Sequence, residues 1–399
     1  MNELVRRIAI TIGALLLFRL GSHIPLPGSS LQSDLLASSG INRISIFALV
    51  LTPYISAAIL VQLLSVVWGR LSALERSGEA GRRKIARITL IVTLLLASFQ
   101  AYGVASAMQD ISGLVAEPGG WFLLSATASM VGGVFFMVWL SDQITRHGIG
   151  NGIALVLSVN ILLSFPAEVA TAIELLRQGQ VSGNLVLFNA VLWVALVAMM
   201  VLIEGARRNV QVQYAARQVG KRLFAPRQSM LPIKINSAGF LIPVTVMPWL
   251  LFVPLALASF IFGRTQALAA AYDHLQFGRP AHIIVGAVVV FVLAFIYTAY
   301  VLDPERAAET LHKQGGTFPG VEPGEASADY LDRIVSLTTV VGAVYLVIVS
   351  LIPEALVAGG VALPYKIGGG SVLVVVCTIL DLKKQVRALS LTNPGDVRQ

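Results

Sequence analysis

Residues 44–67, ISIFALVLTPYISAAILVQLLSVV, form a run of 24 residues without a charged side chain. A helix of about 20 apolar residues crosses a hydrocarbon core of about 30 Å, so this run predicts a membrane span. The run also carries Pro53, with the polar side chains of Thr52, Tyr54, Ser56 and Gln62 around it. A helix that faces only lipid gains nothing by keeping such groups. We therefore expect this span to line something other than lipid.

The composition places the whole chain in a membrane. Of its 399 residues, 56% are hydrophobic and 13% are charged, and the mean hydropathy is +0.78. These values are too apolar for a soluble globule of this length, so the chain is predicted to be a polytopic membrane protein. The single cysteine, Cys377, excludes an intramolecular disulfide and leaves the compartment undetermined.

Charge-free runs elsewhere in the chain predict further spans. They fall at residues 88–109, 118–141, 147–167, 178–203, 235–263, 280–302 and 334–353. Two weaker candidates, 8–24 and 366–382, bring the prediction to ten spans. Because ten is an even number, we expect both termini on the same side of the membrane.

The basic residues set the predicted orientation. If the termini are cytosolic, 23 of the 29 Lys and Arg residues lie in cytosolic segments. An excess of Lys and Arg on the cytosolic side is the usual rule for membrane proteins, so N-in and C-in are predicted. The same rule accounts for the net charge of +8 without nucleic acid as a partner.

Two predicted cytosolic loops, 204–234 and 303–333, are longer than a connection needs, and we expect both to be docking surfaces. The first alternates over NVQVQY as a hairpin strand would and then becomes basic at Arg217, Lys221 and Arg222. The second is acidic, and its Gly-Gly and Pro-Gly pairs break it into turns.

Ten spans divide as five plus five, which gives halves at 1–177 and 178–399 with opposite orientations. Inverted repeats of this kind commonly enclose a pathway at their interface. The Gly-Ile-Gly-Asn-Gly run at 148–152 could suggest a phosphate loop, but no strand precedes it and no Lys-Ser or Lys-Thr follows. We interpret it as a flexible, closely packed start of a membrane helix.

Seven motifs, in this order, resemble the SecY family of translocon channel subunits. They are FRLGSHIPLPG (18–28), RISIFALVLTPYISAAILVQLL (43–64), SGEAGRRK (77–84), QITRHGIGNGI (143–153), YAARQVGKR (214–222), LPIKINSAG (231–239) and PGVEPGEASADYLDR (319–333). The resemblance covers nearly the whole chain. It implies an all-α polytopic membrane protein with ten transmembrane helices in two pseudo-symmetric inverted halves around a central hourglass pore.

The resemblance also implies a function. Such a channel translocates unfolded secretory polypeptides across the bacterial cytoplasmic membrane and releases membrane segments through a lateral gate into the lipid bilayer. Its expected partners are SecE-like and SecG-like small membrane subunits, a SecA motor or the ribosome on the cytosolic loops, and the signal sequences and nascent polypeptides that it carries. The residues expected to serve docking are Arg207, Arg208, Arg217, Lys221, Arg222 and Glu322.

A channel that passes polypeptide but blocks ions needs a ring of aliphatic side chains at its waist, which fits around the chain and dewets when empty. By resemblance this pore ring maps to Leu51, Ile55, Leu157, Ile161, Val374 and one of Val244 or Thr245. AGFLIP at 238–243 carries one residue more than the family's usual spacing, which leaves the last position open between the two. Plain helix packing is the alternative for any one of these side chains.

The lateral gate is expected between the second and third spans on one side and the seventh and eighth on the other. Ser56, Gln62 and Gln100 could pair across it and hold it shut. Satisfaction within their own helices or by water is the equal alternative.

The chain departs from the family in two places. The plug segment, 29–42, is short, although it keeps Leu31, Leu35 and Leu36, so sealing is expected to be weaker or to come mainly from the ring. Glu322 stands where the family usually has an arginine that couples to a partner. Like charges at an interface can cost several kcal/mol, which puts coupling to the usual motor in question, unless Glu322 is a solvated loop carboxylate.

An inverted-repeat secondary transporter is the alternative function. It is disfavoured because the central parts of the eight long spans hold no Asp, Glu, Lys or Arg. An enzyme is disfavoured because the five histidines are scattered and the sequence shows no nucleotide motif, metal-ligand cluster or nucleophile constellation. No cofactor is expected, so energy must come from a partner.

Overall fold

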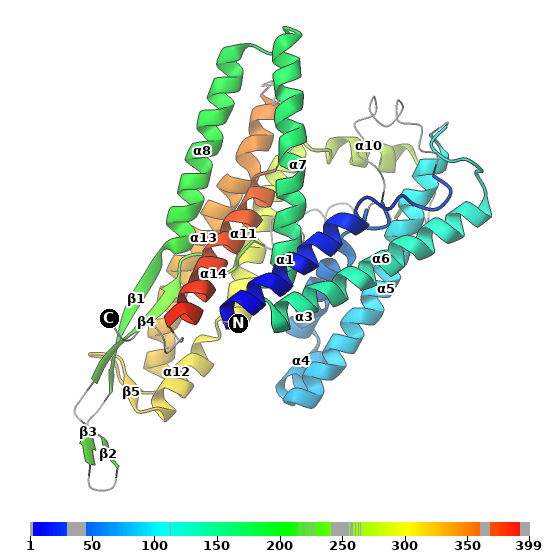
Figure 1. Ribbon diagram of the computed structural model, residues 1–399. Helices are drawn as coiled ribbons and strands as arrows, with labels where there is room; N and C mark the ends of the chain where they lie inside the picture. The colour runs from blue at the N-terminus through cyan, green and yellow to red at the C-terminus, as the bar shows by residue number, and fades with distance from the viewer. Residues whose placement is uncertain are drawn as a thin grey trace. The chain divides into compact units, whose positions relative to one another are not determined.

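The computed structural model describes residues 3–29, 45–111, 113–214, 217–219, 222–224, 227–240, 265–359 and 368–391, together with residues 255, 258, 259, 261 and 263. The chain divides into two compact units, one made of Met1–Ser164 with Thr378–Gln399 and the other of Phe165–Cys377. Helices α7 (Gly152–Arg177) and α14 (Gly369–Leu391), both labelled in Figure 1, each include residues of both units. The pseudo-symmetric halves 1–177 and 178–399 stay a prediction.

Helices dominate both units. The first unit holds α1 (Glu3–Gly21), α3 (Thr52–Val67), α4 (Gly69–Arg76), α5 (Glu79–Gln109) and α6 (Gly120–His147), and the second holds α8 (Gly183–Gly205), α10 (Gln266–His274), α11 (Pro280–Val301), α12 (Pro304–Lys313) and α13 (Glu325–Ala358). Within the described ranges, the helical runs long and apolar enough to cross a membrane are α5, α6, α7, α8, α13 and Pro280–Lys313, which begins with α11. Nine of the predicted spans overlap a helix named above. Most of the tenth, 235–263, lies outside the described residues, and its described residues 255, 258, 259 and 261 are helical.

The prediction of one continuous span over residues 44–67 is wrong in its first third. Helix α3 begins only at Thr52 and has 16 residues, so it is about 24 Å long and shorter than the hydrocarbon core. Pro53 lies in its first turn, where the missing backbone N–H would have had no partner within the helix. The proline therefore marks the start of this helix rather than an interruption within a span.

Turns replace the expected helix over residues 45–51 because Phe47 is packed between two aromatic rings. Its centroid lies 6.3 Å from that of Phe18 on α1 and 5.7 Å from that of Phe136 on α6. Val50 has a φ of 47°, a left-handed conformation that is rare for a β-branched residue. Packing against α1 and α6 therefore overrides the local preference of an apolar run for helix.

Small side chains hold the first unit together. Helix α5 packs against both α3 and α6, and its buried positions include a stripe with four-residue spacing: Thr89, Thr93, Ala97, Ala101 and Ala105. Small residues on one face let helix backbones approach closely, which favours association in lipid. Gly133 of α6 serves the same purpose, because a Cβ there would lie 2.2 Å from the carbonyl oxygen of Ile46.

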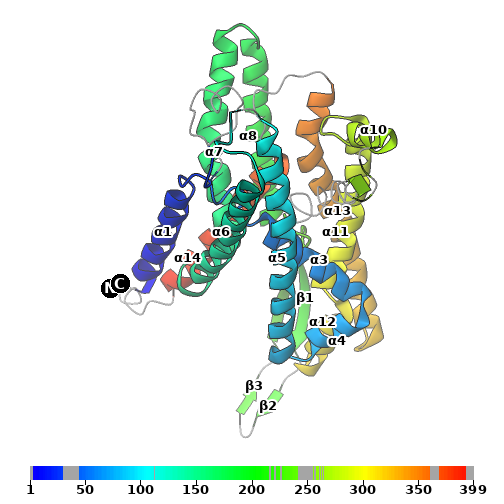
Figure 2. The ribbon, with the colours of Figure 1, turned by 90° about the vertical axis from the view of Figure 1, so that its right-hand side faces the viewer.

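In the second unit, α11 packs alongside α13 (Figure 2). Near the start of α11, the Nδ1 of His282 donates a hydrogen bond to the Glu354 carboxylate of α13. The same carboxylate oxygen accepts a hydrogen bond of 2.9 Å from the backbone N–H of Gly278. Both side chains are buried, with 6% and 2% of their surface exposed. Because an unpaired buried carboxylate is costly, this cluster ties the start of α11 to the end of α13.

The two long loops meet in one small sheet. Strand β1 (Arg207–Tyr214) pairs antiparallel with β4 (Arg227–Lys234), and β5 (Gly316–Thr317) from the second loop pairs with the other edge of β1. Strands β2 (Arg217–Val219) and β3 (Arg222–Phe224) form a hairpin at the far end of β1 and β4 (Figures 1 and 2). The hairpin strand predicted over NVQVQY is confirmed.

A shared apolar core joins these loops, which were predicted separately. It contains Val210, Val212 and Ile233 from the sheet, Ala308 from α12, Phe318 from the following turn, and Leu331 and Val335 from α13. We name β1, β4, β5, α12 and the first turns of α13 the sheet lobe. The alternating valines of β1 need a cover, and α12 with the start of α13 provides it.

Candidate functional site

One face of α7 carries two of the predicted ring residues. Leu157 and Ile161 lie one turn apart and are half-buried, and Asn160 beside them is exposed. The neighbouring Val156 and Ser158 are buried, with 0% and 4% of their surface exposed. A polar side chain in an apolar span is unfavourable against lipid. We therefore expect this face of α7 to border water. Asn160 was missed in the sequence, although an asparagine inside a charge-free run was the available signal.

The other ring positions are spread along the chain. Leu51 immediately precedes α3, and Ile55 one turn later donates its backbone N–H to the Leu51 carbonyl at 3.0 Å. Both side chains are buried. Val374 on α14 is also buried but belongs to the second unit. Val244 and Thr245 lie outside the described residues. The ring as a whole stays a prediction.

The predicted gate residues lie on two packed helices of the first unit. Ser56 on α3 is buried, and its hydroxyl has no hydrogen-bond partner in the part of the chain that the structure describes. Gln62 on α3 and Gln100 on α5 are half-buried. The structure therefore leaves Ser56 with an unmet hydrogen-bonding capacity, while the pairing of these residues across a gate stays a prediction. The plug leucines, Leu31, Leu35 and Leu36, lie outside the described residues.

The glycine-rich run at 148–152 is closed by neighbouring side chains. The backbone N–H of Ile149 donates to Thr11 Oγ1 of α1 at 2.9 Å. A Cβ at Gly152 would lie 1.9 Å from the carbonyl oxygen of Ser141, so only glycine fits there. The predicted close packing is confirmed, and the backbone N–H groups of Ile149 and Gly152 already donate to threonine hydroxyls.

The predicted docking residues lie on or near the sheet lobe. Arg207 and Arg208 are exposed at the start of β1. Arg217 and Arg222 lie on β2 and β3, and Lys221 falls outside the described residues.

Glu322 is exposed in the turn between β5 and α13. Its backbone carbonyl accepts a hydrogen bond from Ser327 Oγ at 2.8 Å. Gly320 and Gly324, with φ of 75° and 111°, turn the chain on either side. The turn is thus held through the backbone of Glu322, and its side chain is exposed at the surface.

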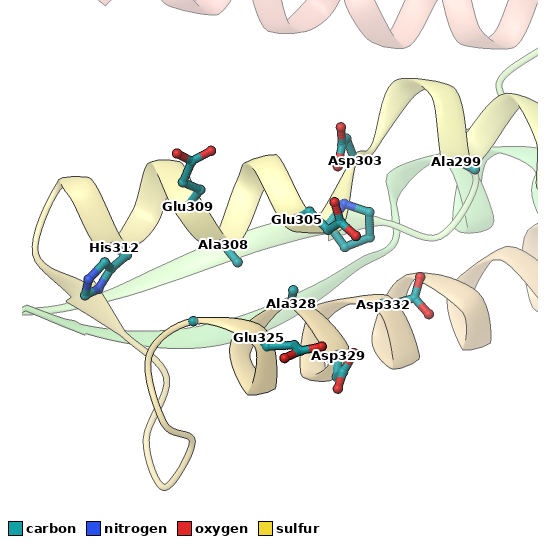
Figure 3. A pocket seen from close by; sticks show the side chains of 12 residues that line it. Ala299, Asp303, Glu305, Ala308, Glu309, His312, Glu325, Ala328, Asp329 and Asp332 are labelled. Atoms are coloured by element: carbon teal, nitrogen blue, oxygen red, sulfur yellow. The ribbon is translucent and has the colours of Figure 1, made fainter. Parts of the chain in front are cut away.

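An acidic pocket of about 670 Å³ lies on the sheet lobe between α12 and α13. The carboxylates that line it are those of Asp303, Glu305, Glu309, Glu325, Asp329 and Asp332. Figure 3 shows Ala308 and Ala328 facing each other between the two helices, with carboxylates on both. Lys313 contacts Glu309 at 2.7 Å and lowers the pKa of that carboxyl, so it is ionised at neutral pH. The lobe therefore carries an acidic face on its helices.

Solved structures share this fold. The chain matches a SecY structure, described as one whose plug domain stabilises the closed state and maintains a membrane seal, with a TM-score of 0.71, 18% identity and coverage of 99% of this chain and 95% of that one. It matches a protein-conducting channel with a TM-score of 0.70, 17% identity and the same coverage. It matches Sec61 in the canine ribosome-channel complex with a TM-score of 0.66 and 16% identity, over 99% of this chain and 95% of that one. The fold is that of protein-conducting membrane channels.

Sequence relatives narrow this class to one family. The chain is 38% identical to the protein translocase subunit SecY of Escherichia coli K12, over 98% of this chain and 93% of the relative. It is 36% identical to that of Rickettsia typhi, over 97% and 93%. The SecY family model matches residues 45–383. The chain belongs to the SecY family, and it is a channel subunit for protein transport and not an enzyme.

Proposed function

We propose that unfolded polypeptide crosses this chain along the face of α7 that carries Leu157, Asn160 and Ile161, through a waist closed by the predicted aliphatic ring. The observation that supports this most directly is the exposure of Asn160 beside two half-buried aliphatic side chains. The asparagine side chain favours a water-filled pathway. The leucine and isoleucine side chains belong to the aliphatic pore ring, which excludes ions when no polypeptide is present.

The proposal includes a lateral gate and an orientation. Helices α3 and α5 form one wall of the gate. The buried Ser56 hydroxyl has no hydrogen-bond partner among the described residues, which supports a hydrogen bond from Ser56 to a residue across the gate. Both termini are cytosolic in this proposal, which the excess of Lys and Arg in the segments on that side supports. The bacterial sources of the relatives, E. coli and Rickettsia typhi, support the bacterial cytoplasmic membrane as the location.

The proposal also includes partner proteins of the channel. SecE-like and SecG-like membrane subunits surround the channel, and a SecA motor or the ribosome docks on the sheet lobe. The solved Sec61 relative is described in complex with a ribosome, which supports docking of this kind. The lobe offers exposed arginines on β1 and carboxylates around the α12–α13 pocket, so a matching partner needs charges of both signs.

Cross-linking to a stalled polypeptide tests this pathway. In a Cys377→Ala background, single cysteines replace Leu157 or Ile161, and a secretory polypeptide carrying a thiol-reactive cross-linker is stalled during translocation. Both positions should cross-link to it, because the polypeptide fills the waist.

The matched controls are cysteines at Leu162 and Leu163 on the same helix, which are exposed and apolar and are expected to face lipid or a membrane subunit. They should cross-link at background level. Equal cross-linking at all four positions, or cross-linking only at the control positions, would contradict the proposed pathway.

A further inference from the structure

Helices α7 and α14 are joined by hydrogen bonds that the pore assignment does not use. Ser158 Oγ on α7 donates to Thr378 Oγ1 on α14 at 2.8 Å. The Thr378 hydroxyl donates in turn to the carbonyl oxygen of Ala154 at 3.3 Å, one turn earlier on α7. The two polar residues are buried, with 4% and 5% of their surface exposed. All three residues belong to the first compact unit.

A second contact joins the same helices nearer their ends. The backbone N–H of Gly150, just before α7, donates to Gln385 Oε1 of α14 at 2.8 Å. Gly150 has a φ of 87°, and a Cβ there would lie 2.8 Å from Leu382 Cδ2. The chain at Gly150 therefore approaches α14 closely, and a side chain at this position would have to displace the end of the Leu382 side chain.

The contacts follow one stripe on each segment. Along the chain, Gly150, Ala154 and Ser158 recur every four residues, and on α14 the partners at 378, 382 and 385 recur at three or four. Residues at these spacings share a helical face, which holds for Ala154 and Ser158 on α7 and for the three positions on α14; Gly150 lies just before α7 begins. The numbering rises on α7 as it falls on α14, so the two helices run antiparallel with one polar seam between them.

We propose that Ser158, Thr378 and Gln385 are positioning residues for the seal of the channel: together they form a clip that fixes the rotation of α7 and α14. Ser158 is adjacent to the ring residue Leu157, and the ring residue Val374 lies one helical turn before Thr378. Successive residues are separated by about 100° around a helix. The clip therefore sets which way both ring side chains are presented. This inference rests on the proposed ring.

Directional bonds suit this role better than apolar packing. An aliphatic interface in a membrane tolerates small rotations, because lipid and neighbouring side chains are equally apolar. A rotation that separates Ser158 from Thr378 breaks a buried hydrogen bond between two side chains, which is unfavourable. The seam thus favours one rotational setting, and loosening it should populate settings in which the ring is incomplete.

The first test removes the clip without changing its volume. The variants are Ser158→Ala with Thr378→Val, and Gln385→Leu. Gln385→Leu loses one hydrogen bond and the double variant loses two. Each net hydrogen bond lost shifts an equilibrium about fivefold. In vesicles containing the complete channel complex, resting ion leak and passage of polypeptides with weakened signal sequences should therefore each rise by at least about that factor.

The matched controls are Thr171→Val on α7 and Ser390→Ala on α14. Among the described residues, their hydroxyls bond to carbonyl oxygens of their own helices, at 2.9 Å in each case. These variants should leak like the wild type. Leu157→Asn, which tests the ring itself, should leak more. A leak that rises in Leu157→Asn but in neither clip variant overturns the clip and leaves the proposed function standing. A leak that rises in none of them overturns both.

A covalent clip provides the second test. In a Cys377→Ala background, Ser158→Cys with Thr378→Cys places two sulfurs at a spacing that suits a disulfide, since the native oxygens are 2.8 Å apart. Cleavage at a protease site inserted near residue 220 shows the disulfide, because the two fragments stay joined under oxidation. The reduced channel should leak and the oxidised channel should seal. Failure to form the disulfide, or an equal leak in both states, overturns the clip.

Discussion

Replacing His282 by leucine should strongly destabilise the second compact unit. The substitution leaves the Glu354 carboxylate, of which 2% is exposed, with the Gly278 N–H as its remaining partner among the described residues. Removing the partner of a buried charged group costs about 3–5 kcal/mol. For a unit of 150–250 residues, each kcal/mol lowers the unfolding temperature by about 2–4 °C. We therefore expect a fall of roughly 10 °C or more.

The assay is thermal unfolding of the purified complex in detergent, at one fixed heating rate because such unfolding is commonly irreversible. Glu354→Gln is the matched variant. Its side-chain carbonyl still accepts hydrogen bonds from Gly278 and His282, so it should lose only a few degrees. The double variant His282→Leu with Glu354→Gln should recover much of the loss, because no buried charge remains. A double variant as unstable as His282→Leu would refute the unpaired charge as the cause, and an unchanged His282→Leu would refute any contribution of the pair.

Further predictions concern the seal, the docking turn and the orientation. Leu51→Asn should raise the resting ion leak more than deletion of residues 31–37 does, because the plug is short; a larger leak from the deletion would make the plug the main barrier. Glu322→Arg should improve translocation with a SecA from an organism whose channel has arginine there and impair it with the native motor, and both effects should shrink as salt rises; equal activity in every pairing would return Glu322 to a solvated carboxylate. Single cysteines that replace Arg76, Arg217 or Lys383 should all be labelled from the cytosol. Labelling of any of them only from outside would overturn the ten-span topology.

Local patterns in the sequence were sufficient to predict most of the helices and one strand. Charge-free runs of about 20 residues have few alternatives to a span in a membrane, and NVQVQY alternates as a half-buried strand does. The start of α3 was misplaced because Pro53 is compatible with both a mid-span kink and a first helical turn. Only the insertion of Phe47 between rings of α1 and α6 decides between them.

Long-range contacts could not be read from local pattern. Strand β5 has two residues, Gly316 and Thr317, and becomes a strand only because the edge of β1 is available to it. The hydrogen bond between Gly150 and Gln385 joins residues 235 apart in sequence, and no local signal indicates it. The glycines at 148–152 did indicate close packing, but they carry no information about which helix approaches.

Transport by the reconstituted complex tests the central claim most directly. The chain is purified with a SecE-like subunit, placed in vesicles and supplied with its motor, ATP and a secretory polypeptide. We predict that the polypeptide becomes protected from external protease, that protection requires the motor, and that a folded, cross-linked version of the same polypeptide is not protected. Absence of protection, together with uptake of a small solute driven by an ion gradient, would contradict the channel and favour a secondary transporter.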